Sequence, residues 1–179
     1  MNLGEMKQKV LRLIEEIAPE KTDLTDDQDI KNKINDVINQ VQYELARIKK
    51  ITAIETIEVK EGEDYELSDL DNFYQLDRIK GVKYEHFGNY VEFEEEGIAK
   101  IYYYKYPKRI DKDSKDTVKL EISDDALEIM PYGVAADLLK SDVSNQYGNI
   151  YANRYNELKN GLDPRYATST AIIEGGIDI

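Results

Sequence analysis

The 179-residue sequence contains no cysteine and no tryptophan, and it has a single histidine. Without cysteine the chain has no disulfide framework, no thiolate nucleophile and no zinc–thiolate site. The histidine, His86, cannot form a multi-histidine metal site, and its place beside a predicted turn indicates a surface residue. No glycine belongs to a GKS or GKT phosphate loop, and no serine stands in a nucleophile-elbow context. We therefore expect no catalytic residue, no cofactor, no metal and no enzymatic activity.

Long apolar runs are also missing, so the sequence predicts no membrane span. The N-terminal segment carries acidic residues and lacks the apolar stretch of a signal peptide, which predicts a soluble protein made in a cytoplasm. Asp111, Asp113 and Asp116 resemble the start of a calcium loop. However, the sixth position is Asp116 where glycine is required, and the twelfth is Ile122 where glutamate is required, so the pattern fails.

The composition is acidic and rich in tyrosine. There are 37 acidic residues against 24 basic ones, which gives a formal net charge of -13. Because nucleic-acid affinity depends on lysine and arginine displacing counterions, we expect no sequence-specific nucleic-acid partner. The 14 tyrosines suit half-buried strands and protein interfaces.

Apolar residues at helical spacing predict two N-terminal helices. The first begins near Leu3 and ends before Pro19. Before the second, Thr25 and Gln28 form a predicted capping box, with Thr25 as the N-cap. The apolar positions of the second helix are Ile30, Ile34, Val37, Ile38, Val41, Leu45 and Ile48.

From about residue 51 the apolar period changes to two, which predicts four to six short antiparallel strands with one polar face. Turns are predicted at residues 61–62, 87–89 and 96–97, where glycine follows polar or aromatic residues. The segment 107–119 is charged and has no regular period, so we expect it to be irregular.

Two further helices are predicted near the C-terminus. Ser123 is the expected N-cap of the first, and Ile122 is expected to contact Leu127 as a hydrophobic staple. Pro131 either kinks this helix or marks the start of its main part. The last helix is expected to end at residues 160–161. Its predicted shared face consists of Tyr147, Ile150, Tyr151, Arg154, Tyr155 and Leu158.

These elements predict an α+β fold, in which a bundle of about four helices carries a small antiparallel β-module between its N-terminal and C-terminal helices. We assign residues 1–50 and 120–163 to the helical domain, residues 51–119 to the β-module and residues 164–179 to an extended tail.

Three groups of residues are candidates for protein contacts. The first is the tyrosine face of the last helix, with Tyr147, Tyr151 and Tyr155. The second is a basic run with Tyr104, Lys105, Lys108 and Arg109, which either meets nucleic acid or an acidic protein, or is an ordinary edge strand whose lysines discourage pairing. The third is the apolar tail, with Ile172, Ile173 and Ile177.

Three stretches in order resemble bacteriophage head–tail connectors, also called adaptor or head-completion proteins, of the podovirus tail tubular type. Residues 64–79 are similar to the family's Y-x-L-P-x-D-F strand–turn, and residues 101–110 to a strand ending in YYKxPxxI. Residues 120–142 are similar to an acidic cap followed by an L-P-Y-Y-V-A-A-x-L-L helix. The sequence departs from these patterns at Ser68, where proline is usual, and at Gly133, where the second tyrosine is common.

The resemblance implies a structural protein of the virion neck, assembled in the host cytoplasm. Its members form a ring, typically of twelve subunits, which docks beneath the capsid portal, extends the DNA channel and receives tail or head-closure proteins. The resemblance leaves open whether the isolated chain is a ring or a monomer. Two alternatives remain at this point: an acidic inhibitor that mimics DNA, and a tail-completion or baseplate protein of the same virion.

Overall fold

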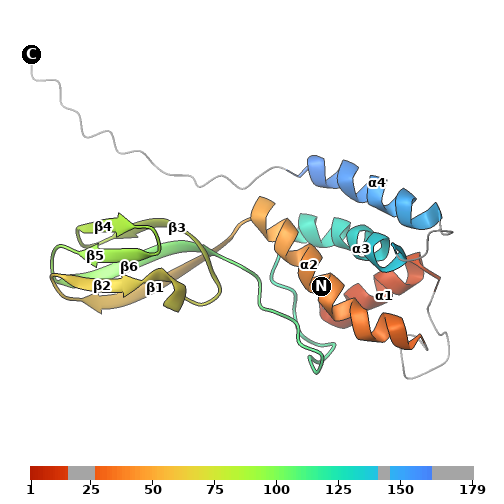
Figure 1. Cartoon of the computed structure of the whole chain (residues 1–179), viewed down its shortest axis with the longest axis horizontal. Helices are drawn as coiled ribbons and strands as arrows, with labels where there is room; N and C mark the ends of the chain where they lie inside the picture. The colour runs from red at the N-terminus through yellow and green to blue at the C-terminus, as the bar shows by residue number, and fades with distance from the viewer. Residues whose placement is uncertain (16–26, 141–145, 163–179) are drawn as a thin grey trace, which may run out of the picture.

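The computed structural model describes residues 1–15, 27–140 and 146–162. The fold is α+β, as predicted: two small antiparallel three-stranded sheets are inserted between two N-terminal and two C-terminal helices. Figure 1 shows the strands gathered at one end of the molecule and the helices at the other. The helices are α1 (Leu3–Leu13), α2 (Gln28–Ile48), α3 (Asp124–Leu139) and α4 (Gln146–Asn160).

The N-terminal helices begin at side-chain caps. The Asn2 side chain accepts a hydrogen bond from the Glu5 backbone N–H at 2.8 Å, and the Glu5 carboxylate accepts one from the Asn2 N–H at 2.9 Å. Helix α2 is capped by Asp27, whose carboxylate accepts hydrogen bonds from the Asp29 and Ile30 backbone N–H groups in the first turn. The prediction of Thr25 as the cap is therefore wrong, because the helix begins at Gln28 and a nearer carboxylate satisfies its free N–H groups.

Helix α3 lies at the centre of the helical domain and contacts α1, α2 and α4. It is apolar on nearly all sides because it is surrounded by other elements, and Met130, Val134 and Ala135 are buried in the shared core. One helix runs through Pro131, so a new helix does not begin there. Ser123 is the N-cap residue, as predicted, although its hydroxyl makes no capping hydrogen bond.

The β-module contains six antiparallel strands, as the alternating pattern predicted. One sheet has the order β1-β6-β3 and the other the order β2-β5-β4. Strand β6 lies in the middle of its sheet, so the interpretation of the basic run as an edge strand is wrong. The strands are β1 (Ile51–Val59), β2 (Glu63–Glu66), β3 (Phe73–Lys80), β4 (Tyr84–Phe87), β5 (Tyr90–Phe93) and β6 (Gly97–Lys105).

The two sheets face each other across a core separate from that of the helices. Val91 and Phe93 of β5 are fully buried, as are Ala99 and Ile101 of β6. Since both sheets direct these side chains inward, their other faces point in opposite directions. The β4–β5 hairpin turns at Gly88, whose φ of 63° belongs to the left-handed region that glycine adopts without strain.

Residues 106–119 form no helix or regular strand, as predicted, and their first part lies against the helical domain. Ile110 is buried in the helical core. The buried Asn39 amide donates to the Ile110 carbonyl and accepts from its N–H, both at 2.8 Å. The Asn35 amide donates to the Asp111 carbonyl at 3.0 Å. Polar residues on the buried side of α2 thus satisfy the backbone of a segment that has no ladder of its own.

Candidate interaction surfaces

The tyrosines of α4 differ in the exposed fraction of their side chains. Tyr155 is 7% exposed and belongs to the helical core, where its hydroxyl donates to a Glu44 carboxylate oxygen at 3.0 Å. Burial, with the nearby Glu44 carboxylate, raises the pKa of Tyr155 well above its usual range. Lys159 contacts the same carboxylate at 2.6 Å and lies over the ring, 4.9 Å from its centroid. Tyr155 therefore makes its contacts within the chain.

Tyr151 and Tyr147 lie progressively nearer the surface. The half-buried Tyr151 donates its hydroxyl hydrogen to the Leu13 carbonyl at 2.6 Å, and burial raises the pKa of this hydroxyl. Tyr147 is 54% exposed and stacks beside Tyr151, with 6.5 Å between the ring centroids. Ile150 is exposed to a similar degree. The exposed apolar surface of α4 is thus its first two turns, beside a hollow of about 150 Å³ that Leu13 and Leu139 help to line.

The basic run is divided between buried and exposed positions. Tyr104 is buried, and its hydroxyl donates to Asp77 at 3.3 Å while Lys50 lies 4.5 Å from its ring centroid. Burial, followed by the charge of Asp77, raises the pKa of the Tyr104 hydroxyl. Lys108 and Arg109 are exposed, and the Arg109 guanidinium lies 4.0 Å from the Asp36 carboxylate. Only Lys108 and Arg109 of the predicted basic residues are thus open to a partner.

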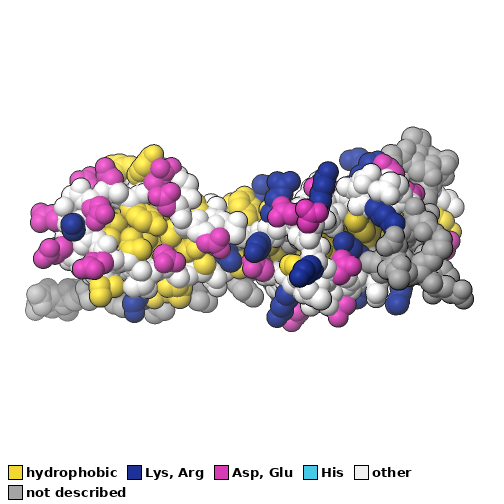
Figure 2. Space-filling view, turned by 90° about the horizontal axis from the view of Figure 1, so that it is seen from below, with side chains coloured by type: hydrophobic (Ala, Val, Ile, Leu, Met, Phe, Trp, Pro, Cys, Tyr) yellow, Lys and Arg dark blue, Asp and Glu magenta, His cyan; other side chains and the backbone are white. Residues whose placement is uncertain are grey.

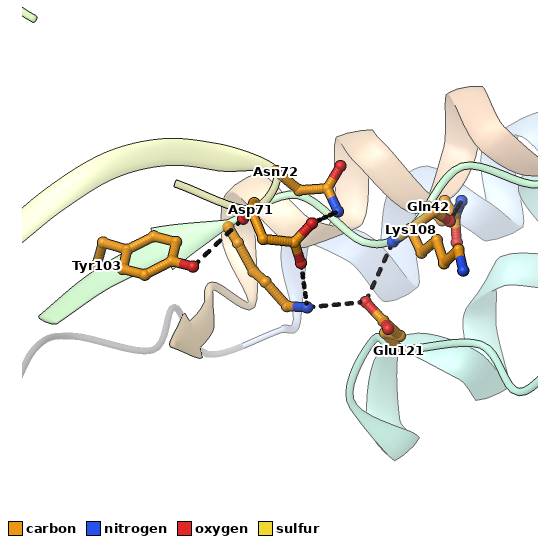
Figure 3. A network of polar contacts seen from close by, with 7 residues as sticks. Gln42, Asp71, Asn72, Tyr103, Lys108 and Glu121 are labelled. Atoms are coloured by element: carbon orange, nitrogen blue, oxygen red, sulfur yellow. Dashed lines mark hydrogen bonds and ion pairs between the residues drawn. The ribbon is translucent and has the colours of Figure 1, made fainter. Parts of the chain in front are cut away.

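Lys105 instead joins the β-module to the helical domain by contacting two carboxylates, Asp71 and Glu121. Figure 3 shows these two acidic residues directed toward one another from the two parts of the molecule. The Lys105 ammonium lies 3.5 Å from Asp71 and 3.4 Å from Glu121, which precedes α3. Burial alone would lower the pKa of Lys105, but the Glu121 and Asp71 carboxylates outweigh it and raise this pKa. Glu121 also accepts from the Lys108 backbone N–H at 3.1 Å. This charge network fixes the end of β6 relative to the start of α3.

An aromatic cluster forms the other side of the same junction. Tyr106 follows β6, and its ring centroid lies 5.4 Å from that of Tyr43 on α2 and 4.8 Å from that of Tyr74 on β3. The Arg47 guanidinium lies 5.9 Å from the Tyr106 ring centroid. These contacts give the two cores a packed connection, so several of the 14 tyrosines serve the junction between the modules.

The outer face of the β1-β6-β3 sheet combines cations with apolar groups, and we call it the basic face. Its defining residues are Ile54, Arg78, Lys80, Ile98, Lys100 and Tyr102. Lys80 is paired directly with Lys100, and Tyr102 with Ile54 on one side and Arg78 on the other. Arg78 and Lys80 lie 4.7 and 5.7 Å from the Tyr102 ring centroid. Ile54 and Ile98 are 59% and 61% exposed, so apolar surface and positive charge adjoin.

The outer face of the β2-β5-β4 sheet carries the opposite charge, and we call it the acidic face. Its defining residues are Asp64, Glu85, Phe87, Tyr90 and Glu92. Glu92 lies on the central strand β5 and is paired with Asp64 on one side and with Glu85 on the other. The next row pairs Tyr90 with Phe87, which are 49% and 57% exposed. Strands β2, β4 and β5 contain no lysine or arginine.

On one side of the molecule, the two ends differ in the signs of charge that they display (Figure 2). On the side shown in Figure 2, apolar side chains on the β-module are surrounded by acidic ones. The helical domain in the same view carries basic and acidic side chains together. Ion pairs there include Lys7–Asp116 at 2.9 Å and Lys9–Glu128 at 3.1 Å. Its surface charges therefore partly compensate one another.

The described residues contain no cluster of three or more histidine, cysteine or acidic side chains arranged to hold a metal ion. Within the same residues no helix combines the length and the hydropathy that crossing a membrane requires. The candidate residues Ile172, Ile173 and Ile177 lie outside the described part of the chain. No protein-family model matches the sequence, and a search of curated proteins found no significant match.

Proposed function

We propose that this chain is a non-catalytic assembly protein that joins a bacteriophage capsid portal to the tail, as a ring-forming head–tail connector around the DNA channel. The observation that carries the proposal is the order of three connector-like stretches, together with their positions in the fold. The first covers most of β2 and of β3 with the turn between them, the second covers the end of β6, and the third contains the whole of α3. Two of the three thus meet at the junction between the modules.

The roles of these residues support an architectural function. Ile110, at the end of the second stretch, is buried in the helical core, and Met130 of the third lies in the same core. Lys105 of the second stretch contacts Glu121 of the third across the junction. The motifs therefore specify how a β-module is held on a helical bundle, which is what a protein acting through its shape requires.

The net charge also suits a conduit. An acidic wall repels the phosphate backbone, so DNA passes such a ring without being held by it. The partners that we propose are the portal protein, the tail or head-closure proteins and further copies of this chain. The site of action is the neck of the virion, after assembly in the host cytoplasm. No sequence-specific nucleic-acid contact and no membrane contact are part of the proposal.

The test is electron microscopy of the protein mixed with its cognate portal. We expect a ring of added density beneath the portal. In the same assay, replacing Ile172, Ile173 and Ile177 with serine should abolish docking, because we propose that the apolar tail adds to the portal or to a neighbouring subunit. Replacing Thr168 and Thr170 with alanine is the matched control in the same tail. Absence of density with the unmodified chain would refute the connector function, whereas normal docking of the serine variant would refute only the role of the tail.

Two other functions fit parts of the sequence less well. An inhibitor that mimics DNA needs a long array of carboxylates free of cations, and the ion pairs of the helical domain interrupt such an array. Competition with DNA for a host nuclease or polymerase would favour it. A tail-completion or baseplate protein differs only in its neighbour, so microscopy of tails without capsids distinguishes it from a connector.

A further inference from the structure

The distribution of charge within the β-module suggests how copies of this chain contact one another. Every lysine and arginine of the six strands lies in β3 or β6, and the exposed ones among them belong to the basic face. The strands of the other sheet carry only acidic charges. A chain of net charge -13 therefore concentrates positive charge on one sheet face and excludes it from the face directly behind.

Folding of a single chain does not explain the acidic face. Carboxylates directly opposite one another across strands repel, and Glu92 has one such neighbour on each side. Asp64, Glu85 and Glu92 make no ion pair with any described residue. Phe87 and Tyr90, exposed beside this row, add apolar surface that the single chain leaves in water. A partner surface that is both cationic and apolar would offset the repulsion among these carboxylates and would cover the exposed apolar side chains.

The basic face is both cationic and apolar. Lys80 and Lys100 are exposed and adjacent, and they form no ion pair within the described residues. Ile54 and Ile98 provide exposed apolar surface beside them. Each face thus presents a charged row next to apolar side chains, with the sign of the row reversed between the faces, although the exposed Glu58, which is paired with Ile98, adds one carboxylate at the edge of the basic face.

We infer that the acidic face of one copy binds the basic face of the next. Since the faces point in opposite directions, this contact is head-to-tail, and it continues from copy to copy until the rotation closes a ring or extends a filament. The inference deepens the proposed connector function. It rests on that function in one respect, namely that the assembly closes as a ring. The contact is defined by residues of the β-module alone, so it is tested without a portal.

The experiment compares two double variants of the full chain by sedimentation velocity. K80E/K100E places carboxylates in the charged row of the basic face, and E85K/E92K places lysines in the charged row of the acidic face. Each alone should associate about 100-fold more weakly than the unmodified chain, because like charges then meet across the contact. An equimolar mixture should regain association to within about tenfold, because each variant then meets the opposite charge on both sides.

General electrostatic repulsion between negatively charged copies predicts a different pattern of association, so the test distinguishes it from the proposed contact. E85K/E92K lowers the net negative charge of the chain, so weaker repulsion alone would make it associate more strongly. K112E/K115E is the matched control for added negative charge, since both lysines are exposed on the segment that follows β6 and Tyr106. This control should associate as the unmodified chain does. All measurements use about 150 mM salt, which screens every sample equally.

The unmodified chain should form species larger than a dimer as its concentration approaches about 100 μM, the range of weak contacts. An unmodified chain that remains monomeric there, or that stops at a dimer, would overturn the inference. So would double variants that associate normally, or a mixture that does not regain association. Circular dichroism of each variant establishes that the strands are retained. Because no portal is present, failure here leaves the connector function standing.

Discussion

Gly133 provides the sharpest test of the packing between α3 and α4. A Cβ added there would lie 2.9, 3.0 and 3.1 Å from three carbons of the Tyr155 ring. Gly133→Ala should gain about 1 kcal/mol of helix propensity, because alanine is favoured over glycine inside a helix. Against this, overpacking a core costs about 1–3 kcal/mol. The sign of the net effect depends on whether the ring can move.

The surroundings of the ring indicate that moving it is costly. The Tyr155 hydroxyl is held by Glu44, and Lys159 covers the ring while contacting the same carboxylate. Loosening a hydrogen bond to a charged acceptor adds about 1.5–3 kcal/mol to the cost. We therefore expect Gly133→Ala to lower the free energy of unfolding by about 1–3 kcal/mol in total, since a partial shift shares these costs.

The assay is urea unfolding of the helical domain, followed by circular dichroism at a helix wavelength. The control is the same substitution in a Tyr155→Leu background, where the ring is gone and Gly133→Ala should stabilise by up to about 1 kcal/mol. The reasoning is refuted if Gly133→Ala raises the stability of the otherwise unmodified chain. The same geometry gives a reason for glycine at position 133, because Tyr155 occupies the space that a side chain there would need.

The remaining predictions concern single substitutions at four positions. Gly81→Ala should unfold the β-module or cost more than about 3 kcal/mol in urea unfolding, because φ is 102° and the added Cβ would lie 2.3 Å from a backbone carbonyl oxygen of β6. Gly88→Ala, with φ of 63° and open space around it, should cost only about 1–2 kcal/mol, and equal costs would contradict this account. Glu92→Lys should raise the stability of the module by about 0.2–1 kcal/mol while weakening self-association, and a loss of stability would show that the acidic row is not repulsive. The hydrogen bond from Lys49 lowers the pKa of Asp125 to about 2, so this carboxylate stabilises the fold above pH 4 and ceases to do so as the pH falls through 2. Asp125→Asn should therefore lower the free energy of unfolding at neutral pH by less than about 1 kcal/mol, because the site is half exposed, and a thermal melt should show a lower midpoint. A difference from the unmodified chain that persists below pH 2 would contradict this.

Local patterns predicted the elements of the fold well. The apolar stripe of α2 and the alternating strands were visible because their periods of 3.6 and 2 are properties of short segments. The α2 cap was mispredicted because Thr25 and Asp27 are both good caps, and only the helix start decides between them. Pro131 was ambiguous for a similar reason, since the packing of α3 against three helices maintains the helix through a residue that disfavours it.

Strand order and the surfaces could not be predicted in the same way. The central position of β6 depends on its pairing with β1 and β3, which are distant in sequence. The acidic face appears only once the register places Glu92 between Asp64 and Glu85. One sequence signal was available, because strands β2, β4 and β5 lack lysine and arginine. This signal predicts an acidic face only if the three strands are known to form one sheet.

The pairing of β1 with β6 has a consequence for the order in which the protein folds. Ile51 is paired with Lys105, so the first and last residues of an insertion of about 55 residues lie on adjacent strands. If the insertion were unfolded, closing it as a loop would cost on the order of 3.5 kcal/mol beyond a constant term. Once the β-module has folded, that entropy has already been lost, and only residues 49–50 and the segment 106–123 remain as connections between the module and helices α2 and α3. The folded β-module thereby reduces the loop-closure entropy that α2 and α3 lose when they pack together, which favours assembly of the helical bundle.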